Sequence, residues 1–148
     1  MATTEDIYTE PDLDPDTLAN LGPLTAMAGI FEGTAGADTH PVADGSETDV
    51  YVERYELQPI DPQTNGPQFF YGLRYHVHIT KPGEVETFHD QVGYWLWEPA
   101  TGTVVQTLAI PRAQVAMASG TAAADGTTFT LRAERGSTTW GICSGPFL

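Results

Sequence analysis

Four histidines are the side chains of this sequence whose type and spacing could support chemistry: His40, His76, His78 and His89. His76 and His78 are two residues apart, so a strand would place both imidazoles on one face. Imidazole nitrogens are common ligands of divalent metals, and Glu84 follows nearby. The opposite face of this strand is richer in aromatic and branched side chains, which favours a solvent-facing position for the histidine pair.

His89 differs from the other histidines because it begins a long aromatic stretch, residues 88–99. The stretch reads as one β-strand, and alternate residues of a strand share a face. His89 would therefore lie on the same face as Gln91, Gly93, Trp95 and Trp97. Two interpretations stay open for a histidine on such a wall. It is either a buried, hydrogen-bonded residue or a ligand to a bound cofactor.

Other catalytic classes find no support in the sequence. Cys143 has no basic neighbour in sequence that would activate a thiol. We find no nucleophile elbow, phosphate-binding loop or dinucleotide fingerprint. A single cysteine excludes an internal disulfide and gives no support for secretion. We therefore assign no catalytic residue and no metal ligand.

Composition and charge limit the function further. The 148 residues fit one domain, and 41% hydrophobic residues suffice for a core. The formal net charge of −14 repels nucleic acids and anionic membranes, which excludes both as expected partners. Neither a signal peptide nor a membrane-spanning apolar run is visible, so we expect a cytoplasmic protein.

Short runs of aromatic and branched residues separated by turn signals predict an all-β fold. Residues 1–13 are predicted to be a flexible acidic tail, and residues 14–148 a single domain. A polar loop is expected over residues 37–48 and a turn over residues 59–67. The predicted strands are residues 28–36, 50–58, 69–80, 88–99, 103–110, 114–119, 127–133 and 138–143. This spacing favours a mostly antiparallel β-barrel or sandwich.

One short helix is predicted over residues 14–22. Asp14 suits the N-cap, Pro15 the first helical position and Gly22 the end of the helix. Leu18 and Leu21 would form its buried stripe.

Two stretches carry a resemblance to a known family. Residues 24–36, preceded by Pro23, look like the opening strand of the nitrobindin-like heme-binding β-barrels. Residues 88–95 resemble a second motif of that family, whose histidine falls on His89. The family is structurally akin to fatty-acid-binding proteins and lipocalins. The resemblance implies a calycin-like antiparallel barrel, with one short helix closing an end. Barrels of about eight to ten strands enclose room for one small ligand.

By this resemblance the ligand is heme b, handled together with nitric oxide or peroxynitrite. If the protein is an enzyme, its activity would be that of a peroxynitrite isomerase. His89 would line the heme pocket, and His40 is a secondary candidate in a loop. The first strand would pass close to the porphyrin, and Trp95 would supply apolar wall. The implied cofactor-binding residues are His89, Gly29, Phe31, Gly33, Trp95 and His40.

One departure from the family matters. Its proximal iron ligand is a histidine on a C-terminal strand, and this sequence has no histidine after His89. Either the chain is a fragment or this member has lost the ligand. A barrel left incomplete at its C-terminus would expose strand edges, which favours a homodimer formed by strand pairing.

Two alternatives to heme binding remain from the sequence. The first is a non-catalytic carrier of a lipid or other small hydrophobic ligand in the same barrel. The second is a cupin-like metal-binding protein that uses His76 and His78. The spacing to Glu84 is longer than the cupin motif has, and Pro82-Gly83 falls between.

Overall fold

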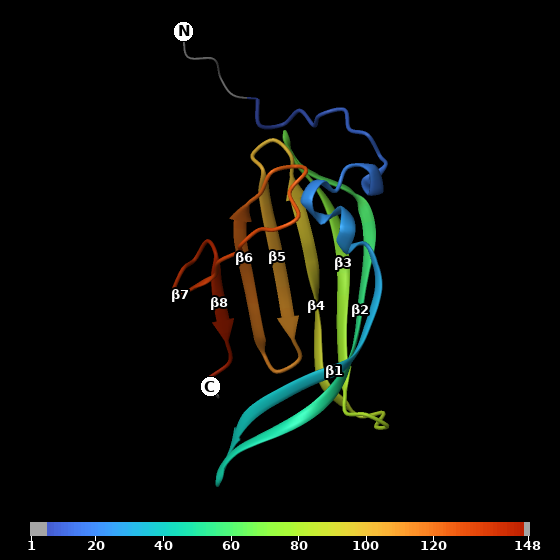
Figure 1. Cartoon of the computed structure of the whole chain (residues 1–148). Helices are drawn as coiled ribbons and strands as arrows, with labels where there is room; N and C mark the ends of the chain where they lie inside the picture. The colour runs from blue at the N-terminus through green and yellow to red at the C-terminus, as the bar shows by residue number, and fades with distance from the viewer. Residues whose placement is uncertain (1–5, 147–148) are drawn as a thin grey trace.

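The computed structural model describes residues 6–146 and contains one eight-stranded sheet (Figure 1). Neighbouring strands are antiparallel, except that β7 runs parallel to β8. The order across the sheet is β1-β2-β3-β4-β5-β6-β8-β7. The strands are β1 Gly29–Val42, β2 Gly45–Asn65, β3 Gln68–Thr80, β4 Thr87–Glu98, β5 Thr103–Ile110, β6 Gln114–Thr121, β7 Glu134–Arg135 and β8 Gly141–Ser144.

The predicted fold class is confirmed: the chain is all-β, mostly antiparallel and has eight strands. The sheet is open rather than closed. Within residues 6–146, β1 pairs with β2 on one side and with no strand on the other. The far end of the β1–β2 hairpin instead curves and projects beyond the lower end of the remaining strands (Figure 1). The predicted tail lies partly in residues 1–5, which are outside the described residues, as are residues 147–148.

The core lies on one face of the sheet, which we call the inner face. It carries the odd-numbered residues of β3 and β4 and the even-numbered residues of β5, because side chains alternate along a strand. Tyr75 and Leu73 are almost fully buried there. The other buried members of the core are Leu21, Leu24, Leu57, Tyr71, Val77, Trp97 and Val104. The opposite, outer face carries Arg74, His76 and His78.

The predicted helix over residues 14–22 is replaced by two 3-10 helices, η1 Thr17–Ala19 and η2 Gly22–Met27. Asp16, not Asp14, caps η1 by accepting a hydrogen bond from the Ala19 amide. Leu21 is buried as predicted, but Leu18 is 54% exposed. The cause is that η1 ends at Ala19, so Leu18 and Leu21 do not belong to one continuous helix. The buried residue of η1 is Thr17, whose hydroxyl donates to the Ile60 carbonyl of β2 at 2.6 Å.

Three further predictions were wrong. The turn expected over residues 59–67 is the end of β2, which runs to Asn65, and the turn itself covers only residues 66–67. The expected loop at residues 37–48 is the paired end of β1 and β2, with a turn only at residues 43–44. These residues are polar because this end of the hairpin projects beyond the core. Backbone pairing between β1 and β2, and not burial of apolar side chains, holds them in strands. Residues 127–133 form no strand, although Phe129 and Leu131 still pack against the core.

Among residues 6–146, no helix is long and apolar enough to span a bilayer.

Candidate functional site

The structure divides the four histidines between the two faces of the sheet. His76 and His78 lie on the outer face with their rings stacked at 5.9 Å. His76 Nε2 contacts Asp90 Oδ2 at 3.1 Å, and His78 Nε2 contacts Thr87 Oγ1 at 3.0 Å. His89 lies on the inner face, opposite Ile79 of β3. His89 is therefore separated from His76 and His78 by the sheet and cannot complete a cupin-like set of ligands with them.

His40 and His89 instead line one hollow on the inner face. Its volume is about 510 Å³. It lies toward the end of the sheet that holds the β5–β6 turn, away from η1 and η2 (Figure 1). The residues that line it are Asp38, His40, Tyr51, Ile79, Phe88, His89 and Arg112.

Two irregularities in strand pairing bring these residues together. Gly33 pairs with Glu53 and Gly36 with Tyr51, so β1 has one residue more than β2 between these pairs. From that bulge onward, the even-numbered residues of β1 share the face of the odd-numbered residues of β2. His40 thereby reaches the inner face from a strand, not from the loop that the sequence predicted.

The second irregularity lies in β4. Ile79 pairs with His89 and Thr80 with Thr87, so Phe88 is the extra residue. Because of this bulge, two consecutive residues, Phe88 and His89, both line the hollow. The His40 and Phe88 rings lie 6.3 Å apart across it.

His89 begins a chain of hydrogen bonds that runs from the hollow into the core. The Arg112 guanidinium can only donate, so His89 Nδ1 accepts from it at 3.5 Å. His89 Nε2 then carries the proton and donates to Gln91 Oε1 at 3.3 Å. The Gln91 amide donates to the Tyr75 hydroxyl at 2.9 Å, which donates to the Thr107 carbonyl at 2.8 Å. Both contacts of the imidazole are long, so a ligand can replace either one at low cost.

Trp95 lies on the same face but in the packed part of it. Its indole nitrogen donates to the Tyr55 hydroxyl at 2.7 Å, and its ring meets Phe129 at 6.1 Å. Burial raises the pKa of Tyr55 to about 12, although the hydrogen bond from Trp95 acts in the opposite direction. Burial also raises the pKa of Tyr75. Trp95 does not line the hollow.

Gly29, Phe31 and Gly33 are paired with Leu57, Tyr55 and Glu53, and so belong to the inner face at its β1 edge. Phe31 is 48% exposed, since no strand covers this edge within residues 6–146. None of the three lines the hollow. Of the six residues implied by the resemblance, the hollow unites His40 and His89 only.

Two polar residues of the hollow, Asp38 and Arg112, were not singled out from the sequence, and neither were Glu47 and Asp49, which lie beside His40. A signal for the acidic ones was present. Asp38 and His40 lie two residues apart, as do Glu47 and Asp49, on either side of the turn residue Asp44. A two-residue hairpin turn there brings the pairs face to face.

The residues of the hollow fit a heme in three respects. His89 offers an imidazole whose present hydrogen bonds are long. Ile79 and Phe88 supply apolar wall, and Arg112 supplies a cation for the carboxylates of the ligand. The volume of about 510 Å³ lies within the usual range of small-molecule pockets, about 300–1,000 Å³.

The fold and the hollow define a class: an antiparallel β-sheet protein with a candidate ligand site on its inner face. The family follows from the sequence match. The family model of the THAP4-like, heme-binding beta-barrel domain matches residues 20–144, and the chain belongs to this family. This match confirms the family suggested by the opening strand and the His89 stretch. Searches of curated proteins and of solved structures gave no match.

Proposed function

We propose that the protein binds heme b in the hollow that His40 and His89 line. The observation that carries the proposal is the placement of His89. It lies on the wall of the hollow, beside Arg112, in a chain that belongs to a heme-binding family. His89 is the first candidate to offer a nitrogen to iron, and His40 the second.

The other residues of the hollow would hold and shield the cofactor. Ile79, Phe88 and Tyr51 would exclude water from its faces, and Arg112 would pair with a propionate. The chemistry that a bound heme supplies is iron-centred handling of nitric oxide, or isomerisation of peroxynitrite to nitrate. The assignment of nitric oxide or peroxynitrite chemistry is supported by membership of the family alone.

Hemin titration of the purified protein tests the proposal. We expect a shifted Soret band that saturates at one hemin per chain. His89→Ala should weaken binding by about tenfold or more, since the loss of one contact worth about 1.4 kcal/mol has that effect. His76→Ala is the matched control, because His76 is a half-exposed histidine on the outer face.

Two results would contradict the proposal. One is a spectrum identical to that of free hemin at every ratio. The other is an equal loss of affinity in the His76 and His89 variants, which would indicate binding to surface imidazoles.

A second candidate function is the transport of a lipid or other small hydrophobic molecule without iron. What favours it is the apolar share of the hollow, with Tyr51, Ile79 and Phe88 on its wall. Native mass spectrometry of the protein as purified separates the two functions. A porphyrin mass supports heme binding, and a co-purified acyl chain supports the carrier.

We also propose that two copies of the chain associate through the free edge of β1. An edge strand presents unpaired backbone groups that readily pair with another strand. The 14 residues of β1 and the exposed Ile30 and Phe31 support this proposal. The net charge of −14 disfavours nucleic acid as a partner, because the phosphate backbone is also negative.

A further inference from the structure

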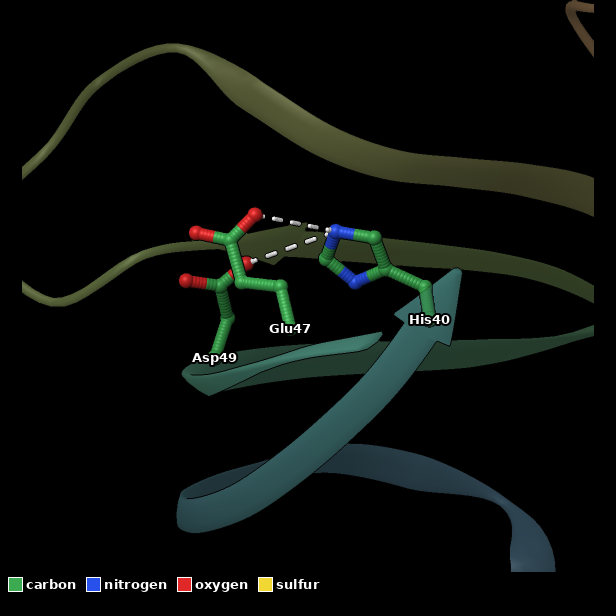
Figure 2. Close-up of side chains that lie close together, drawn as sticks. All are labelled: His40, Glu47 and Asp49. Atoms are coloured by element: carbon green, nitrogen blue, oxygen red, sulfur yellow. Dashed lines mark ion pairs between the residues drawn. The ribbon is translucent and has the colours of Figure 1, made fainter. Parts of the chain in front are cut away.

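We propose that His40, Glu47 and Asp49 form a binding site for one divalent transition-metal cation of the Zn²⁺ type. The three side chains come from facing positions of the β1–β2 hairpin and point toward one another (Figure 2). The proposal goes beyond heme binding, since it needs no porphyrin and assigns a different group to the wall of the hollow.

The spacing of the three ligand atoms suits a small cation. His40 Nε2 lies 3.5 Å from Glu47 Oε2 and 3.9 Å from Asp49 Oδ2. All three ligand atoms lie within 4.8 Å of one another. Zinc bonds of about 2.0–2.1 Å in a tetrahedron separate neighbouring ligand atoms by about 3.3 Å. To form the coordination shell, the two His40 contacts would shorten by about 0.2 and 0.6 Å, and the two carboxylate oxygens, which lie within 4.8 Å of each other, would also have to approach by up to about 1.5 Å.

The tautomer of His40 is set for metal binding. Asp38 Oδ2 lies 2.9 Å from His40 Nδ1, and an ionised carboxylate can only accept, so the proton sits on Nδ1. In the neutral ring, the lone pair of Nε2 then faces Glu47 and Asp49. A carboxylate that holds the second nitrogen of a ligating imidazole is the usual arrangement around protein metals.

Asp49 gives a second, independent observation. The Asp49 side chain is 17% exposed, but its Oδ2 atom is buried and has no hydrogen-bond partner among residues 6–146. The 3.9 Å to His40 Nε2 is too long for a hydrogen bond. A buried carboxylate oxygen without a partner is costly, and such groups call for a missing ion or water. The oxygen points toward the imidazole nitrogen, where the cation would lie (Figure 2).

The local charge also fits a dication. Asp38, Glu47 and Asp49 are opposed by one ammonium, Lys81 Nζ, which lies 3.4 Å from Asp49 Oδ1. With a neutral imidazole, His40, Asp38, Glu47, Asp49 and Lys81 together carry two net negative charges, which one divalent cation would neutralise. Arg112 lines the same hollow, but its guanidinium contacts His89. One imidazole and two carboxylates favour Zn²⁺ or a neighbouring transition metal over Ca²⁺ or Mg²⁺. Three protein ligands would leave the fourth position of a tetrahedral zinc shell open for water or another ligand.

Metal-free, untagged protein without hemin provides the test. ZnCl₂ is titrated by calorimetry, and CoCl₂ by its visible ligand-field absorption. We expect one site per chain. His40→Gln and Asp49→Asn should each abolish it, and Asp38→Asn should weaken binding by about 10–100-fold, as loss of a supporting carboxylate does. His76→Gln is the matched control, because His76 also contacts a carboxylate, that of Asp90, at 3.1 Å.

The alternative to a metal site is a proton on His40 Nε2 that is shared with the Glu47 and Asp49 carboxylates, with no metal cation bound. The wild-type protein would then give no saturable Zn²⁺ or Co²⁺ signal, and the proposal would be overturned. Binding that persists in both ligand variants would overturn it as well. Thermal melts verify that the variants fold, and Glu47→Gln replaces any that does not, since Glu47 is 55% exposed. Hemin is absent throughout, so failure here leaves heme binding untouched, and the reverse also holds.

Discussion

The Tyr55 phenol is the side chain whose ionisation the fold changes most clearly. Burial on the inner face raises its pKa to about 12, well above the ordinary value of 10.0. Its partner is the Trp95 indole, which donates to the hydroxyl at 2.7 Å. Because the indole can only donate, this bond would favour a phenolate, but removal of the phenol from water outweighs it.

We therefore predict that stability falls in alkaline solution between about pH 10 and pH 12. Unfolded tyrosine loses its proton at the lower pH, whereas folded Tyr55 holds it to the higher one. The raised pKa thus contributes stability that is present below pH 10 and is lost above it. Denaturant unfolding at a series of pH values measures the effect.

Tyr55→Phe should reduce this alkaline loss, because phenylalanine has no proton to release. The matched control is Tyr94→Phe, a tyrosine that is 42% exposed on the outer face. Equal pH dependence in wild type and Tyr55→Phe would show that burial of this phenol is not the cause.

At the scale of elements, the junction of β4 and β5 depends on Gly93. Around it the strand pairs are Val92 with Ala109 and Trp95 with Gln106. Between these pairs the Tyr75 hydroxyl donates to the Thr107 carbonyl, and the Tyr94 amide donates to the Thr107 hydroxyl at 2.9 Å. A Cβ on Gly93 would collide with the Thr107 carbonyl oxygen and press on the Tyr75 ring.

Gly93→Ala should accordingly lower the free energy of unfolding by at least about 1–3 kcal/mol, the usual effect of overpacking. Gly33→Ala is the matched control in β1, since a Cβ there meets no atom within 4 Å. That variant should be neutral or more stable by up to about 1 kcal/mol, because alanine loses less backbone entropy. Urea unfolding compares the two, and equal changes in both would refute this account of Gly93.

At the scale of the whole molecule, we propose that the free edge of β1 governs association. We predict a concentration-dependent dimer in sedimentation velocity. Ile30→Lys should weaken it, because lysine on an edge strand opposes strand pairing. Ile30 is 57% exposed on β1, and the matched control Val92→Lys changes a 47% exposed residue on the outer face of the interior strand β4. A monomer at all concentrations, or equal effects of both lysines, would exclude pairing through β1.

Three features could be predicted from the sequence: the strands that alternate cleanly, the family, and the face of the sheet on which His89 lies. The β5 prediction, residues 103–110, matches the observed strand, and the long aromatic stretch differs from β4 by one residue at each end. These features depend on local pattern: alternation sets which residues share a face wherever a strand is half buried. The family follows from short motifs in residues 24–36 and 88–95, which need no tertiary information.

Which residues meet could not be predicted from the sequence. His40 reaches the hollow because an extra residue in β1 shifts its pairing with β2, and no local pattern records that shift. The polar end of the same hairpin shows no hydrophobic alternation, and the spacing of its acidic residues around Asp44 has meaning only once the hairpin is known, so Glu47 and Asp49 were missed. Leu18 is exposed because η1 ends early, and the sheet stays open at β1. Register and closure are set by contacts between distant segments, which a single sequence does not display.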